Sequence, residues 1–130
     1  MSSEIPSISD SEWLVASEVW AEEGLTAADI ADRLASRTHW KQKTINTFLA
    51  RLVAKGVLAA RPDGRAFRYH AGIPKEQCVR QESESFLKRV FGGAVAPMLA
   101  HFCETQDLSP EEIDTLRDIL KRKGRRSDAK

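Results

Sequence analysis

Apolar positions repeat with two different periods along the chain, and the changes of period divide it into segments. Up to Gly56 the spacing is helical, starting after Ser9 and Glu12, which have the spacing of a capping box. The pattern predicts helices at about 10–22 and 27–36. A third helix follows, ends at Gly56, and carries the longest apolar stripe of the three, formed by Ile45, Phe48, Leu49, Leu52 and Val53.

After Gly56 the period falls from 3.6 to 2. Residues 57–61 and 65–70 are predicted as short strands, joined where Asp63-Gly64 favours a tight turn. Phe67 and Tyr69 share one face of the second strand, and we expect both aromatic rings to pack the hairpin against the core. Three helices followed by a hairpin predict a winged helix-turn-helix fold.

From residue 74 onward the helical period returns in three successive segments. Pro74 suits the first turn of a helix, Gly92-Gly93 interrupts it, and Ser109 can cap the last one. The fold class is therefore mainly α with a small antiparallel β wing. We expect a winged helix-turn-helix domain at 1–73, a helical dimerisation domain at 74–123 and a disordered tail at 124–130.

The apolar stripes of the C-terminal helices predict a homodimer. Three short helices have too little depth to bury so many large side chains, and a two-fold partner would cover them. The alternative is that the stripes pack back onto the N-terminal elements, whose own apolar faces already satisfy one another. The expected dimerisation residues are Phe86, Leu87, Val90, Phe91, Val95, Met98, Leu99, Phe102, Ile113, Leu116 and Leu120.

Charge is distributed unevenly, although the chain as a whole carries only +1. Residues 37–75 hold nine Lys or Arg and a single acid, Asp63, whereas residues 1–36 hold eight acids and one base. A polyanion responds to such a local excess rather than to the total charge. Double-stranded DNA is therefore the first partner to consider.

The third helix and the hairpin carry the residues expected to bind DNA. Lys43, Thr47 and Arg51 lie opposite the apolar stripe on a helical wheel, and Arg51 is the best candidate for a forked contact with guanine. Arg65 at the wing tip could contact the neighbouring backbone or minor groove. The alternative is an ordinary solvated face. The full predicted set is Lys41, Lys43, Thr44, Asn46, Thr47, Arg51, Arg65 and Arg68.

Other kinds of site find little support in the sequence. Cys78 and Cys103 match neither a disulfide framework nor a metal pair, so we expect reduced thiols and no metal. No catalytic spacing or phosphate loop occurs, which predicts no enzyme, no cofactor and no small-molecule substrate. Trp40 is expected to pack at the turn before the third helix. Without a signal segment or a long apolar run, a cytoplasmic protein with no membrane partner is expected.

Several short segments in one register give the chain a family resemblance. Between Ile8 and Lys123 it resembles the penicillinase repressors and their methicillin-resistance and copper-operon relatives, a family of winged-helix dimers. The segments that carry the resemblance are Ser11-Glu12-Trp13, Lys43-Thr44-Ile45 with Thr47 and Arg51-Leu52, Lys55-Gly56, Gly64-Arg65, Ser85-Phe86-Leu87, His101-Phe102, Leu108-Ser109 and Glu111-Glu112-Ile113.

The resemblance implies a homodimeric repressor of an operator with dyad symmetry, controlling β-lactam resistance or a related stress operon. In the β-lactam branch, a sensor-linked protease leads to cleavage of the repressor at an Asn-Phe bond. His101-Phe102 occupies that position here, with His in place of Asn. The copper branch carries paired cysteines near its C-terminus, which this chain lacks. A second interpretation stays open: a winged-helix module that binds an acidic protein partner.

Overall fold

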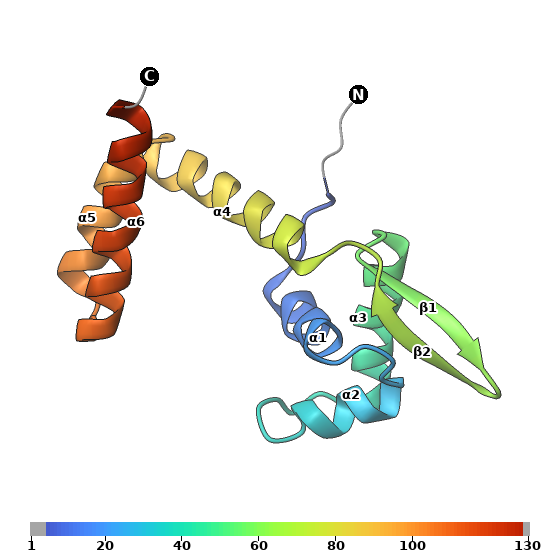
Figure 1. Ribbon diagram of the computed structural model, residues 1–130. Coiled ribbons are helices and arrows are strands. Elements are labelled where there is room, and N and C mark those ends of the chain that lie inside the picture. The colour runs from blue at the N-terminus through green and yellow to red at the C-terminus, as the bar shows by residue number, and fades with distance from the viewer. Residues whose placement is uncertain (1–4, 129–130) are drawn as a thin grey trace. The chain divides into compact units, whose positions relative to one another are not determined.

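The computed structural model describes the backbone of residues 5–128 and the side chains of residues 5–125. Two compact units make up the chain, the first ending at Ser85 and the second beginning at Phe86. Figure 1 shows the elements in chain order: α1 (Asp10–Ala21), α2 (Ala27–Leu34), α3 (Gln42–Ala54), β1 (Leu58–Asp63), β2 (Ala66–Ala71), α4 (Lys75–Phe91), α5 (Val95–Thr105) and α6 (Pro110–Asp128).

Reciprocal side-chain caps fix where helices begin. At α1 the Glu12 N–H donates to Ser9 Oγ at 3.1 Å, and the Ser9 N–H donates to Glu12 Oε1 at 2.9 Å. Thr26 and Asp29 make the same pair of bonds at α2. Ser109 caps α6 in this way together with Glu112. Each box satisfies backbone N–H groups that the first helical turn leaves without partners. The predicted starts of these helices are confirmed.

The core of the first unit lies where α1, α2 and α3 meet (Figure 1). The side chains at its centre are fully buried: Val15, Val19, Ile30, Leu34, Ile45, Leu49 and Leu52. Trp40 packs beside this core with its ring centroid 5.0 Å from that of Phe48, which confirms its packing role. Cys78 of α4 is buried in the same core, so the start of α4 belongs to the first unit. The expected domain boundary at residue 73 falls just before α4, whereas the two compact units divide within α4, after Ser85.

The hairpin has an apolar face and a charged face. Its antiparallel register pairs Ala60 with Tyr69 and Pro62 with Phe67 on one face, and Arg61 with Arg68 on the other. The strands close through Gly64-Arg65, and Gly64 has φ +64°, which favours glycine. The turn is therefore shorter than the sequence suggested, because pairing continues through Asp63.

Only one of the two hairpin aromatics packs on the core. Tyr69 is half-buried against it, and burial raises the pKa of its phenol. Phe67 is 52% exposed, so the expectation that it also packs there is wrong. The physical reason is strand length: Figure 1 shows the hairpin extending past the helices, and Phe67 lies two residues nearer the turn than Tyr69.

The second unit forms helices without forming a core. Phe86, Phe91 and Phe102 gather within 5.9–6.5 Å between ring centroids. Nevertheless, none of the side chains described between residues 86 and 125 is buried. Val90 and Leu120 are 54% and 57% exposed. The three amphipathic helices predicted here are present, and their apolar faces remain largely open to solvent.

The helix α6 continues beyond its expected end. It runs to Asp128 and so includes most of the segment expected to be a disordered tail, while Ala129 and Lys130 lie outside the described residues. Lys and Arg are good helix formers, and cations near a helix C-terminus interact favourably with its dipole. Neither the polar composition of this segment nor Gly124 therefore ends the helix.

A buried ion pair joins the start of α1 to the end of α3. Glu12 is 2% exposed, and Lys55 Nζ donates to its Oε1 at 2.5 Å and to the Ser7 carbonyl oxygen at 2.6 Å. Burial by itself raises the pKa of Glu12, but the hydrogen bonds from Lys55 and the Ser9 N–H outweigh it and lower the pKa below its ordinary value.

We expect Glu12→Gln to lower the free energy of unfolding by about 1–3 kcal/mol at pH 7, because the Lys55 ammonium loses its anionic partner. Because the pKa of Glu12 is lowered by folding, its carboxylate stabilises the fold fully above the pKa of the unfolded chain, about 4.3. This stabilisation is lost as the pH falls through the lower pKa of the folded chain. The difference between Glu12→Gln and the unchanged chain should therefore shrink towards about pH 3. Urea unfolding followed by circular dichroism measures the free energy of unfolding at each pH.

Glu84→Gln, which removes an exposed carboxylate paired with Arg80, serves as the control and should change the free energy of unfolding by about 0.5 kcal/mol or less. Equal effects of the two substitutions would contradict this role of Glu12.

Candidate nucleic-acid interface

The face of α3 opposite the core exposes most of the residues that the sequence predicted. Ile45, Leu49 and Leu52 are buried, whereas Lys43, Asn46, Thr47 and Arg51 are exposed, and Thr44 is half-buried at the edge. Lys41 at the N-cap is also exposed, as are Arg65 and Arg68 on the hairpin. A period of 3.6 residues accounts for this separation because every third or fourth residue returns to the same side. The predicted set therefore forms a surface rather than part of the core.

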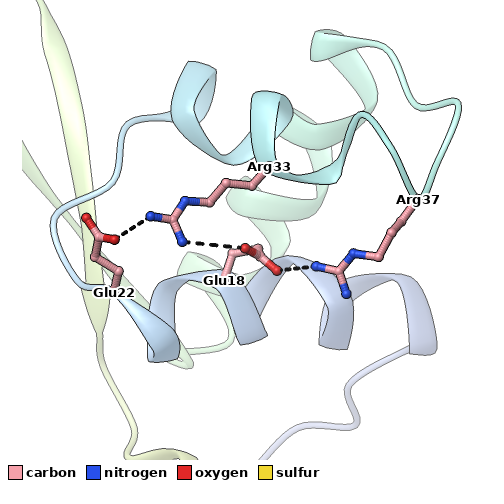
Figure 2. Close-up of polar contacts among 4 residues, drawn as sticks. All are labelled: Glu18, Glu22, Arg33 and Arg37. Carbon is pink, nitrogen blue, oxygen red and sulfur yellow. Dashed lines mark hydrogen bonds and ion pairs between the residues drawn. The ribbon is translucent and has the colours of Figure 1, made fainter.

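Ion pairs within the chain remove part of the positive charge counted in the sequence. Figure 2 shows Arg37 of the loop after α2 bound to Glu18 of α1, with Arg37 Nη2 2.5 Å from Glu18 Oε2. Arg33 bridges Glu18 and Glu22 beside it. Lys55 is held by Glu12. The acids of residues 1–36 thus neutralise specific bases instead of acting as a diffuse negative region.

Arg68 is also held within the protein. Its Nε donates to Asp63 Oδ2 at 2.5 Å and its Nη1 donates to the Gly24 carbonyl oxygen at 2.7 Å. The hydrogen bond that Arg68 donates to Asp63 raises the pKa of Arg68. Arg68 therefore ties the hairpin to the segment before α2 and carries less free charge than the sequence suggested.

The remaining cations of residues 37–75 form a separate group. Within the described part of the chain they make no ion pair: Lys41, Lys43, Arg51, Arg61, Arg65 and Lys75. All are exposed. We call the surface formed by Lys41, Lys43, Arg51, Arg61 and Arg65 the basic face. A surface of unpaired cations on one helix and its neighbouring hairpin attracts polyanions.

Short hydrogen bonds order the polar side chains of α3. Gln42 Nε2 donates to Asn46 Oδ1 at 3.0 Å and to the Ala27 carbonyl oxygen at 3.1 Å, which links α3 to α2. Thr47 Oγ1 donates to the Lys43 carbonyl oxygen at 3.1 Å. The residue selection from the sequence missed Gln42, although its position four residues before Asn46 was a signal that the two amides could meet on one helix face.

The described residues offer little for other chemistry. No group of three or more His, Cys, Asp or Glu among them could hold a metal ion. Burial raises the pKa of the Cys78 thiol, while Cys103 is an exposed free cysteine of α5. In the same part of the chain, every helix is too short or too polar to cross a lipid bilayer.

Comparisons with known proteins agree on one family. Residues 8–122 match the penicillinase repressor family. The penicillinase repressor of Bacillus licheniformis is 36% identical over 116 residues, covering 89% of this chain and 91% of that protein. The methicillin resistance regulatory protein MecI of Mammaliicoccus sciuri is 31% identical over 116 residues, covering 89% and 94%.

A solved structure supports the same relationship in three dimensions. The monomeric form of Bacillus licheniformis BlaI, in complex with the blaP half-operator, superposes with a TM-score of 0.50 and 34% identity, covering 56% of this chain and 89% of that one. Because the family match spans most of the chain, the assignment rests on both units. The chain belongs to the penicillinase repressor family.

Proposed function

We propose that the chain is a homodimeric transcriptional repressor that binds double-stranded operator DNA of dyad symmetry. The observation that carries the proposal is the basic face: unpaired cations and short polar side chains lie together on the exposed side of α3 and on the adjoining hairpin. Relatives named as penicillinase and methicillin-resistance regulators support it, and they make a β-lactam-resistance operon the first target to examine.

In this proposal α3 enters the major groove. Arg51, exposed and without an ion pair among the described residues, provides the fork that can meet the O6 and N7 of guanine. Asn46 presents its amide nitrogen, since its oxygen already accepts from Gln42. Lys41 and Lys43 at the start of the helix contact phosphates, which position the helix without reading sequence.

The open apolar faces of the second unit support dimer formation by a second copy of this chain. A described unit whose apolar side chains are half-buried or exposed leaves much of its apolar surface in water. An aromatic cluster already present in this unit could lie at the centre of such a contact; it consists of Phe86, Phe91 and Phe102. One related chain occupies a half-operator, and two linked reading surfaces bind far more tightly than one.

The proposal includes induction by proteolysis at the bond between His101 and Phe102, in the middle of α5. Phe102 contacts the rings of Phe86 and Phe91, so a cut there would separate it from the helix turn before it and weaken the dimer. Mass spectrometry of the protein from β-lactam-treated cells should then show two fragments that meet at this bond. Loss of repression with an intact chain would exclude this route.

Selection from a randomised duplex pool tests the DNA-binding proposal. The enriched duplexes should contain inverted repeats. With about six phosphates contacted per protein, log Kd against log salt should have a slope near 5 in magnitude. Equal weak binding to enriched and scrambled duplexes would favour an acidic protein as the partner instead.

Arg51→Ala tests the role of α3 directly. We expect affinity for the enriched duplex to fall about 10- to 100-fold, because a forked base contact contributes about 1–3 kcal/mol. Lys75→Ala removes the same charge from an exposed position on α4 and should change the affinity less than about threefold. If both substitutions have the same effect in a fluorescence-anisotropy titration, net charge rather than α3 determines binding.

Dimer formation can be tested independently of DNA. Val90→Glu or Leu120→Glu would place a carboxylate in the apolar contact and should shift the chain from dimer to monomer in analytical ultracentrifugation, because an unpaired buried charge is costly. Arg117→Glu, also on α6 but at a polar position, serves as the matched control. A monomer with the unchanged sequence at micromolar concentration would overturn the dimer.

A further inference from the structure

The hairpin ends in an apolar pair that stays exposed within the described part of its unit. The face bearing Leu58, Ala60 and Tyr69 begins buried or half-buried beside the helices and continues to Pro62 and Phe67 near the turn. Both of these last residues are exposed. Covering the exposed part of such a ring with another molecule would contribute favourable free energy.

The surroundings of Phe67 indicate the chemistry of what covers it. Arg65 at the turn and Arg61 on the opposite face of the hairpin are exposed and form no ion pair with any described residue. Asp63, on the same strand as Arg61, is already bound to Arg68. A basic protein surface would be repelled by these arginines, and an apolar one would leave them unpaired. A nucleic acid offers phosphates to the arginines and apolar sugar and base surfaces to the ring.

The position of the hairpin next to α3 indicates which part of the duplex it reaches. Val57 and Leu58 begin the hairpin from the core that α3 also enters, and the turn extends away from the helices (Figure 1). With α3 in the major groove, a neighbouring ribbon reaches the adjacent minor groove. Arginines favour the narrow minor groove of A·T-rich DNA, and apolar side chains such as Phe pack against sugars or enter between base steps there.

We propose that Phe67, supported by Pro62, is a DNA-contacting residue that places an aromatic ring in the operator minor groove, next to the phosphate contact of Arg65 at the turn. This inference rests on the proposed function and deepens it, since it assigns an apolar contact to a surface so far described only by charge. The contact differs in kind from a lysine or arginine contact: it releases no counterion, so its contribution is independent of salt.

Fluorescence-anisotropy titrations of the enriched duplex over a range of salt concentrations test the proposal with three variants. Phe67→Ala should weaken binding about tenfold, as expected when an aromatic ring loses much of its buried contact, and should leave the salt slope unchanged. Arg65→Ala should reduce the magnitude of the slope by about 0.9, as removal of one phosphate contact requires. Phe67→Leu, which keeps apolar bulk, should stay within about threefold of the unchanged chain.

Two controls separate this contact from a structural role. Val79→Ala removes another exposed apolar side chain of the same unit, from α4, and should leave DNA affinity unchanged. Thermal unfolding of Phe67→Ala should match that of the unchanged chain, because the half-exposed ring lies outside the core.

The outcomes distinguish the two proposals. If the unchanged chain binds the enriched duplex and Phe67→Ala binds equally well, the minor-groove contact is wrong and the repressor proposal stands. The contact is also wrong if Phe67→Ala weakens dimerisation instead of half-site binding, or lowers the unfolding temperature. If the unchanged chain prefers no duplex over a scrambled one, both proposals are wrong.

Discussion

Burial of one side of α3 is the constraint on which the rest of the structure depends. Ile45, Leu49 and Leu52 fill the space between α1 and α2, so the opposite side of the same helix must face outward. That side carries the cations and short polar residues. The hydrophobic effect thus orients a polar surface without any polar interaction being needed to point it. The Glu12–Lys55 pair then holds the far end of α3 to the start of α1.

Ion pairs within the first unit reduce the number of cations that this surface offers to a partner. Acids near the N-terminus bind Arg37 and Lys55, and Asp63 binds Arg68, so these bases act as links between elements. Of the six cations of residues 37–75 that make no ion pair in the described chain, five lie on α3, at its N-cap or on the hairpin, and the sixth, Lys75, lies on α4. A partner with regularly spaced negative charges meets these cations and not the paired ones. The distribution of acids therefore shapes the basic face as much as the distribution of bases does.

The sequence predicted the elements and the faces well because both depend on local rules. Capping residues and apolar periods are visible in a chain without knowledge of its neighbours, and they placed α1, α2, α3 and the hairpin correctly. The features that the sequence did not predict depend on how residues far apart in the chain lie in the folded structure. The exposure of Phe67 follows from how far the strands extend past the helices, and the capture of Arg68 follows from the approach of Gly24. The helical extension of α6 escaped because polar composition was weighed above helix propensity.

The ring contacts at the end of α4 impose a condition on the spacing of its residues. Phe86 and Phe91 lie on the same helix, and their ring centroids are 5.9 Å apart. Each residue turns a helix by about 100°. Inserting or deleting a single residue between Phe86 and Phe91 would therefore rotate one ring away from the other and open the cluster that Phe102 of α5 completes. This short stretch of sequence can thus change in composition more readily than in length.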